Sequence, residues 1–161
     1  MEAQPQTPPV EPPRGFFSGH VDDKGRLKLP VDMQQFLASL GDDRYFVTST
    51  DGRIARIYPI SVWKENEKVL AELAKVDSDA ADALLFMAND LGSDAKIDPQ
   101  GRITLSTDLR RALVLENQEV RMDWSQDGIN IYSKAEYEAR KRQAQENLSE
   151  KLKTAKSKGF K

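Results

Sequence analysis

The chain has 161 residues and no cysteine, and its 24 Lys and Arg against 26 Asp and Glu give a formal charge of −2. This length fits one or two small domains, and 39% apolar with 31% charged residues is a globular composition. Without cysteine, disulfides, thiolate nucleophiles and Cys-based metal sites are excluded, and a single histidine excludes a multi-histidine site. No apolar run approaches the roughly 20 residues that cross a bilayer. We therefore expect a soluble cytoplasmic protein with no membrane partner.

Catalytic motifs are missing as well. The sequence has no Gly-Lys-Ser/Thr phosphate loop and no nucleophile elbow. We therefore expect a protein that is not an enzyme, with no cofactor, no metal and no small-molecule substrate.

The first fourteen residues carry five prolines and almost no side chain to bury. Such a segment cannot offset the entropy lost on ordering, so residues 1–14 are predicted to be a disordered arm. The fold is expected to begin near Gly15.

An internal repeat is the strongest feature of the sequence, and it places Gly25 and Gly101 76 positions apart. Seven of the residues that recur unchanged at this spacing are Asp22, Gly25, Arg26, Asp32, Leu37, Asp51 and Gly52, which recur as Asp98, Gly101, Arg102, Asp108, Leu113, Asp127 and Gly128. The spacing then falls to 74, which pairs Ile57 with Ile131 and Trp63 with Tyr137.

Each copy predicts the same elements in the same order. A short strand (16–21 or 94–97) leads through a glycine turn into a second strand, and a helix follows (31–40 or 107–115). Two further strands (45–49 with 54–58, or 119–124 with 129–132) are joined through Asp51-Gly52 or Asp127-Gly128, a strong hairpin signal.

Helices are predicted between the copies and after the second copy. One begins at Pro59, and the next carries an apolar stripe that fits either the protein core or a subunit interface: Ala80, Ala83, Leu84, Met87, Ala88 and Leu91. The last helix begins at Ser133 with a capping box and extends to about Lys158. Its distal half is polar and is expected to project or fray.

The repeated turns, Asp22 to Arg26 and Asp98 to Arg102, carry the chemistry. Glycine permits positive φ, and the aspartate can reach across the turn to the arginine guanidinium. One interpretation is a structural turn with a surface ion pair worth about 0–1 kcal/mol. The other is that the strand offers arginine to a DNA groove, where it is the best bidentate partner of guanine O6 and N7.

The doubled Asp-x-x-Gly-Arg pattern, the two Asp-Gly hairpins and the segments 58–63 and 131–137 resemble the MraZ family over residues 15–143. That resemblance implies an α+β fold in which two tandem AbrB-like repeats form a swapped-hairpin β-barrel with flanking helices. It also implies a nucleoid-associated transcription regulator that binds guanine-containing direct repeats in double-stranded DNA upstream of its own division and cell-wall gene cluster. The resemblance further implies assembly into a closed homo-oligomeric ring.

The resemblance also implies site residues on the repeated turns. Asp22 with Arg26, and Asp98 with Arg102, are the expected DNA-contacting pairs, on turns shaped by Gly25 and Gly101. Three further residues are expected to add positive charge at the DNA: Lys24, Lys28 and Arg110. The expected divisions are 15–75 for the first repeat with its trailing helix, 76–93 for a connecting helix, 94–143 for the second repeat, and 144–161 for a basic tail.

The two copies are expected to contribute unequally. The second has Gln100 where the first has Lys24, and the first has Gln34 where the second has Arg110. A net negative charge opposes DNA binding, but residues 64–94 hold three basic and eight acidic side chains, whereas residues 134–161 hold nine and four. Each chain is expected to bind weakly, so that affinity requires an oligomer.

Two other functions stay open at this point. A ring-forming module that binds a protein partner would use the arginine turns as structural ion pairs. An enzyme using the carboxylates of Asp22 and Asp98 would need the two turns to converge in one cleft.

Overall fold

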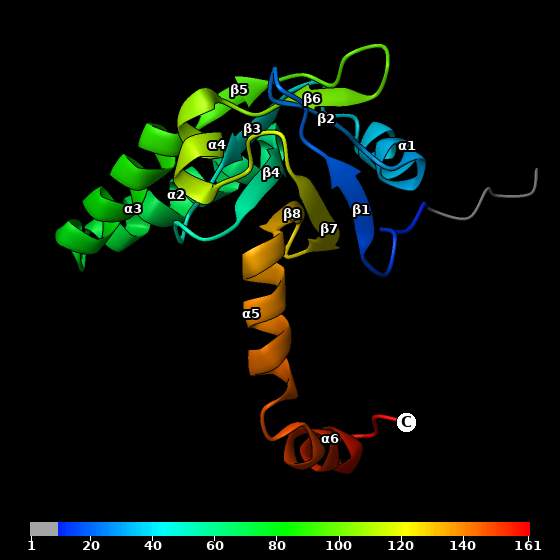
Figure 1. Ribbon diagram of the computed structural model, residues 1–161. Helices are drawn as coiled ribbons and strands as arrows, with labels where there is room; N and C mark the ends of the chain where they lie inside the picture. Colours follow the sequence, from blue (N-terminus) through cyan, green and yellow to red (C-terminus); the bar gives the residue numbers. More distant parts are fainter. Residues whose placement is uncertain (1–9) are drawn as a thin grey trace, which may run out of the picture.

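A computed structural model describes residues 10–161, and it confirms the expected mixed α+β fold (Figure 1). The first nine residues of the predicted arm lie outside the described residues. The elements of the first repeat and the connecting helices are β1 (Phe17–His20), β2 (Arg26–Lys28), α1 (Val31–Leu40), β3 (Tyr45–Thr48), β4 (Ala55–Pro59), α2 (Ile60–Ala74) and α3 (Ser78–Leu91). Those that follow are β5 (Ser93–Ala95), β6 (Arg102–Thr104), α4 (Thr107–Leu113), β7 (Glu119–Ser125), β8 (Gly128–Ser133), α5 (Lys134–Gln145) and α6 (Leu148–Ser157).

The two repeats are interleaved through their strands. A six-stranded antiparallel sheet has the order β1-β7-β8-β4-β3-β5, so the first strand of each repeat pairs with the third strand of the other. The second strands of the repeats, β2 and β6, pair antiparallel as a separate two-stranded ribbon. Closure of these strands into one swapped-hairpin barrel stays a prediction.

One hydrophobic core joins the ribbon to the large sheet. Leu27 and Ile103 face each other at the centre of the ribbon and are fully buried. Alternation along each short strand turns these residues inward and their neighbours outward. Side chains of both repeats complete the core: Leu29, Met33, Leu37, Ile57, Leu105, Leu109, Leu115, Met122, Ile129 and Ile131. Neither repeat can therefore bury its own apolar face without the other.

Helices α2 and α3 pack against each other beside the sheet (Figure 1). Trp63 anchors α2 in a smaller cluster with Phe46, Tyr58 and Ala88. The predicted stripe of α3 is divided, because Ala88 and Leu91 are buried whereas Leu84 and Met87 are each 41% exposed. Part of this stripe is therefore core, and part lies on the surface.

Local details differ from prediction where single residues adopt positive φ. The second hairpin turns at Gln126 and Asp127, with φ of 50° and 61°, so that Gly128 already belongs to β8. Both turn residues are left-handed, as a two-residue hairpin requires. Helix α4 ends at Leu113 rather than at 115, since Val114 has φ of 57°.

The last predicted helix is two helices. Asn147, with φ of 54°, separates α5 from α6. Helix α5 extends away from the sheet, and α6 lies beyond its far end (Figure 1). The distal half therefore projects, as expected, but as a second helix with its own direction.

Candidate nucleic-acid interface

The two glycine turns have nearly identical backbones. Gly25 and Gly101 have φ of +81° and +79°, and each donates its N–H to the carbonyl of the aspartate three residues earlier. Asp22 N–H then donates to the Arg26 carbonyl at 3.0 Å, and Asp98 N–H to the Arg102 carbonyl at 2.8 Å. Each turn therefore closes on itself before the ribbon strand begins.

The aspartates hold the arginines as the sequence predicts. Asp22 Oδ2 accepts a hydrogen bond from Arg26 Nε at 2.8 Å, while Oδ1 accepts from the backbone N–H of Arg26 at 2.8 Å and of Lys24 at 3.0 Å. In the second repeat, Asp98 makes the equivalent bonds to Arg102 Nε at 2.8 Å and to the N–H groups of Arg102 and Gln100 at 2.9 Å. Each carboxylate thus fixes both the turn and the guanidinium.

These bonds favour the ionised carboxylate. The N–H of Arg26, together with the Arg26 side chain and the Lys24 N–H, lowers the pKa of Asp22 from 3.8 to about 2, against a smaller opposing effect of burial. The N–H of Arg102 and its side chain likewise hold the pKa of Asp98 below its ordinary value. Both pairs are therefore charge-assisted at neutral pH.

The ribbon presents both arginines on one face. Arg26 and Lys28 lie on the outer side of β2, and Arg102 and Thr104 on the outer side of β6, because Leu27 and Ile103 point inward. Lys28 is directly opposite Arg102, and Arg26 opposite Thr104. The arginine side chains keep 32% and 28% of their surface exposed. Among residues 10–161, their terminal Nη atoms have no hydrogen-bond partner.

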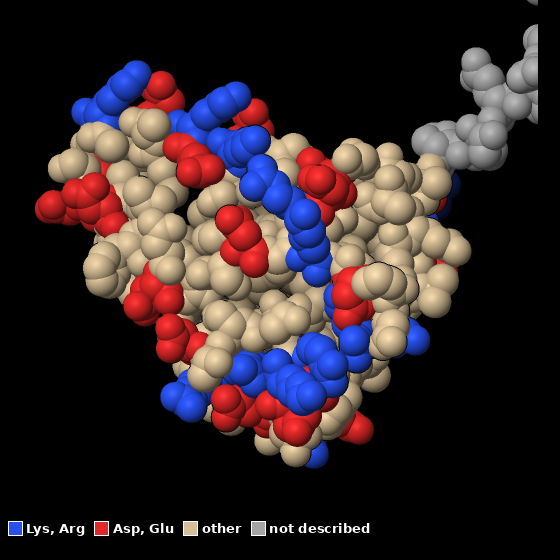
Figure 2. Space-filling model, turned by 90° about the horizontal axis from the view of Figure 1, so that it is seen from above, with Lys and Arg blue, Asp and Glu red and all other residues tan. Residues whose placement is uncertain are grey.

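Figure 2 looks down on the side of the molecule where the ribbon lies. Lys and Arg side chains cross the middle of this face, with acidic side chains between and beside them (Figure 2). Lys24 in the first turn and Lys28 on the ribbon are both exposed. The face therefore carries cations although the whole chain has a net charge of −2.

Arg110 occupies a different kind of position. Its side chain is 11% exposed and lies against the first turn, where a Cβ on Gly25 would stand 2.7 Å from the Arg110 Cζ. It donates to Thr107 Oγ1 at 3.0 Å and lies 4.0 Å from Glu116. Arg110, expected at the DNA phosphates, therefore packs beneath the turn of the other repeat.

Gln34 takes the equivalent position under the second turn. Its Nε2 donates to the Leu29 carbonyl at 2.7 Å, and its amide contacts Gly101. The helix of each repeat therefore supports the glycine turn of the other. Sequence reasoning matched Gln34 with Arg110 but had no signal for this exchange.

The two aspartates do not share a cleft. The N–H of Leu105 donates to the Gly25 carbonyl and that of Leu29 to the Gly101 carbonyl, so the turns lie at opposite ends of the ribbon. Across the described part of the chain, no group of three or more His, Asp and Glu side chains could hold a metal ion. The arrangement suits two separate cationic contacts rather than paired carboxylate chemistry.

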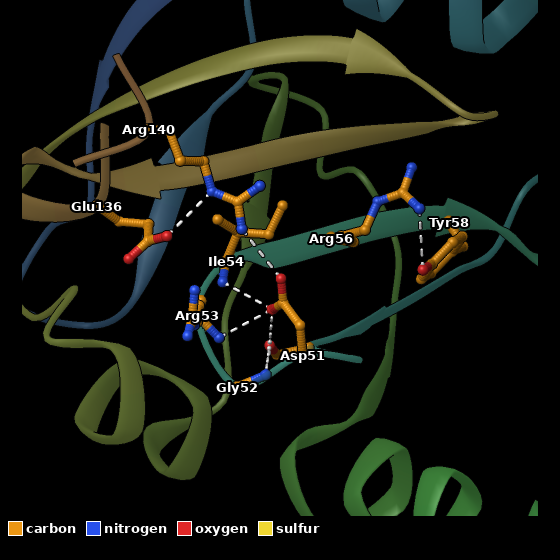
Figure 3. A network of polar contacts seen from close by, with 9 residues as sticks. Asp51, Gly52, Arg53, Ile54, Arg56, Tyr58, Glu136 and Arg140 are labelled. Carbon is orange, nitrogen blue, oxygen red and sulfur yellow. Dashed lines mark hydrogen bonds and ion pairs between the residues drawn. The ribbon is translucent and has the colours of Figure 1, made fainter. Parts of the chain in front are cut away.

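Sequence reasoning missed a buried arginine between the hairpins (Figure 3). Arg56 donates to the Tyr58 hydroxyl at 3.1 Å and to the backbone carbonyls of Ser125 and Gln126 at 2.6 and 3.1 Å. It thereby ties β4 to the second hairpin turn. Its cross-strand partner in β8 is Asn130. Because Arg56 alternates with the core residues Ala55 and Ile57, strand alternation places it on the other face of β4, so the sequence carried no signal that it is buried.

A second contact joins the first hairpin loop to α5 (Figure 3). Arg140 pairs with Asp51 at 3.0 Å and with Glu136 at 3.0 Å. Burial would raise the pKa of Asp51, but the N–H groups of Arg53 and Ile54 and the Arg140 charge outweigh it and lower that pKa. This pair orients α5 as it leaves the sheet. We assign both networks a structural role.

Comparison with known proteins identifies the family. A family model described as "MraZ protein, putative antitoxin-like" matches residues 93–158. A transcriptional regulator MraZ of Acidobacterium capsulatum is 36% identical over 99 residues, which cover 62% of this chain and 67% of that protein. The Koribacter versatilis protein of the same name is 33% identical over 114 residues (70% and 77%), and that of Desulforamulus reducens 32% over 141 residues (86% and 95%). No helix within residues 10–161 is long and apolar enough to span a membrane. The chain belongs to the MraZ family.

Proposed function

We propose that this protein is a sequence-specific, DNA-binding transcription regulator that reads guanine-containing direct repeats through Arg26 and Arg102. Its relatives are named transcriptional regulators, which supports DNA binding in general. The observation that carries the specific proposal is the matched bracing of the two arginines on one ribbon face.

The contacts from the aspartates leave both arginines suited to bind base edges. Each aspartate engages Nε and leaves the terminal Nη atoms for a bidentate contact with guanine O6 and N7. A side chain already fixed by its neighbour loses less conformational entropy on binding than a free one. Diagonal positions on an antiparallel ribbon are about 7–8 Å apart, and bases along one strand rise about 3.4 Å. The two arginines therefore match bases about two steps apart.

Affinity in this proposal comes from assembly. The exposed Lys24 and Lys28 give one chain only a few phosphate contacts, and Arg110 adds its charge from beneath the turn. A closed ring with swapped-hairpin subunits would present the turns to successive repeats, and the second and later contacts would form at high effective concentration. The proposed target is the promoter of the chain's own division and cell-wall gene cluster, in a nucleoid-associated protein.

The test is a fluorescence-anisotropy titration against the duplex upstream of the protein's own gene and a scrambled duplex of equal length. Arg26→Ala and Arg102→Ala should each weaken specific binding by about 1–3 kcal/mol and reduce discrimination between the duplexes. Arg53→Ala is the matched control, because Arg53 is an exposed arginine on the hairpin loop beside α5.

Two outcomes of this titration would contradict the proposed role of the arginine turns. If wild-type protein bound both duplexes equally, or if discrimination survived in both variants, the arginine turns would be structural ion pairs. The protein would then fit better as a ring-forming module for a protein partner.

A further inference from the structure

The outer surface of the α2–α3 pair is unusually apolar for a free surface. Six large apolar side chains of these helices and their connection are at least 39% exposed, and Val76 and Phe86 reach 85% and 70%; the others are Val69, Leu84, Leu85 and Met87. Helix α3 has apolar side chains on its buried and its exposed sides. A helix of this kind normally packs against partners on more than one side.

A groove runs between the two helices. Its apolar lining consists of Leu70, Ala71, Ala74, Ala81 and Leu85, and each helix adds one carboxylate, Glu67 from α2 and Asp82 from α3. The groove encloses about 210 Å³, which is less than the roughly 300 Å³ at the lower end for small-molecule sites. Its size suits a few side chains of another helix.

Helix α6 has the complementary surface. Leu148, Leu152 and Ala155 recur at i, i+4 and i+7 and form one apolar stripe. Helical geometry places Lys151 on one side of that stripe and Lys156 on the other. Within residues 10–161, the side-chain hydrogen bonds of α6 all lie inside the helix, and Figure 1 shows it far from α2 and α3. Its apolar stripe therefore lacks a partner in its own chain.

We propose that α6 of one copy docks in the α2–α3 groove of a second copy. The leucine stripe would cover the groove lining, and Lys151 and Lys156 would meet Glu67 and Asp82. Two acidic α2–α3 pairs facing each other would instead bring like charges together, which favours the basic helix as the occupant. This inference rests on the oligomer in the proposed function, and it does not depend on DNA reading.

The proposed contact joins two different surfaces. Each copy would offer its α6 to one neighbour and its groove to another, which is a heterologous interface. Such contacts close into a ring when the rotation between neighbours permits, and otherwise continue as an open chain. The projection of α6 beyond α5 is what allows it to reach a neighbour.

The test is assembly without DNA, measured by sedimentation at micromolar concentration and about 0.15 M salt. Lys151→Glu with Lys156→Glu should weaken subunit association about tenfold or more, because both edge contacts become repulsive. Adding Glu67→Lys and Asp82→Lys to that variant should restore association. Lys153→Glu is the matched control, since Lys153 lies on the opposite side of α6 beside Glu150. Far-UV circular dichroism checks that all variants remain folded.

Covalent trapping gives a second measurement, because the natural chain has no cysteine. Leu85→Cys with Leu152→Cys in one chain should produce a ladder of disulfide-linked copies on mild oxidation, whereas Leu85→Cys with Lys153→Cys should not.

Two results would overturn the proposed interface. One is an assembly that both lysine reversals leave unchanged; if Leu85→Glu then dissociates it, the groove binds another helix pair. The other is a wild-type monomer, which would also remove the proposed ring. Arginine-turn variants that assemble but lose DNA discrimination separate this interface from DNA reading.

Discussion

The two repeats build the same turn in different surroundings. Their glycines differ by 2° in φ, and both aspartates lie 2.8 Å from the arginine Nε. The first turn nevertheless contains Lys24 and packs on Arg110, whereas the second contains Gln100 and packs on Gln34. Duplication has therefore kept the brace constant while the charge around it has diverged.

The exchange of helices explains why this difference is hidden in the sequence. Arg110 belongs to the second repeat but serves the first turn, and Gln34 belongs to the first repeat but serves the second. Lys24 and Arg110 belong to different repeats in the sequence, but both lie beside Gly25 in the fold. The first turn thus has Lys24 and Arg110 beside it, whereas Lys28 lies directly opposite Arg102 and adds its charge at the other end of the ribbon.

Replacing Gly25 and Gly101 by alanine should give the largest difference in stability between the two turns. Both substitutions hold an alanine at positive φ, in the left-handed conformation, which costs about 1–2 kcal/mol. A Cβ on Gly25 would also stand 2.7 Å from the backbone carbonyl of Leu105, whose own N–H is bonded to the Gly25 carbonyl, whereas on Gly101 it would meet the flexible Gln34 amide. Gly25→Ala should therefore lower the free energy of unfolding by about 3 kcal/mol or more, and Gly101→Ala by about 2 kcal/mol.

Gly41→Ala is the control for this comparison. Gly41 has φ of +83° and no atom within 4 Å of the added Cβ, so it reports the left-handed cost alone. Urea unfolding of the three variants measures the differences. Equal losses in the free energy of unfolding at Gly25 and Gly101 would mean that the backbone beside Gly25 shifts as easily as the Gln34 side chain beside Gly101.

Exchanging the lysines of the first repeat for the residues of the second should have a more modest effect, a change in the salt dependence of DNA binding. Lys24→Gln with Lys28→Thr gives the first repeat the residues of the second. Each lysine that neutralises a phosphate contributes about 0.9 to the salt slope, so the slope should fall by about two per chain at most. Discrimination between native and scrambled duplex should remain, because phosphate contacts carry no base information.

The reverse exchange, Gln100→Lys with Thr104→Lys, should steepen the salt dependence. Anisotropy titrations between about 0.05 and 0.2 M salt measure both slopes. A loss of discrimination in the first variant would show that the lysines, and not only the arginines, read bases.

Local sequence patterns predicted most elements because their signals are local. The glycine turns, helix α1 with its bounds and the Asp–Arg pairs follow from residues within a few positions of each other. Partner exchange between the repeats is not local, since alternation along a strand is the same whichever strand lies beside it. The support of Gly25 by Arg110 was therefore beyond such reasoning.

Competition between similar local signals explains the smaller errors. Asp127-Gly128 has the composition of a hairpin turn, but Gln126 and Asp127 take the left-handed positions, and Gly128 lies where a Cβ would stand 2.9 Å from Arg56. A larger residue at this position would crowd the buried Arg56 guanidinium, whose position the sequence pattern did not reveal. Polar periodicity continues through Asn147, so it did not predict the break between α5 and α6.

Acid titration tests whether the two braces are equivalent. The folded pKa values of Asp22 and Asp98 lie below the ordinary value of 3.8, and that of Asp22 is about 2. A carboxylate with a lowered folded pKa stabilises the protein fully above its unfolded pKa and loses that contribution as the pH falls through the folded pKa. Asp22→Asn and Asp98→Asn should therefore be less stable than wild type at pH 6. The Asp22 gap should shrink between about pH 4 and pH 2, and the Asp98 gap should shrink as the pH falls below its ordinary pKa of 3.8.

Urea unfolding at each pH measures these gaps, and Asp23→Asn is the matched control because Asp23 is exposed beside Asp22 and belongs to neither brace. Subtraction of the wild-type curve removes the general acid destabilisation that other carboxylates cause. Matching gaps for Asp22 and Asp98 would show that duplication preserved the brace as an energetic unit and confined divergence to the surrounding charge. A pH-independent gap at either position would mean that the carboxylate acts there through neutral hydrogen bonds, and that its arginine is less firmly held for a base contact.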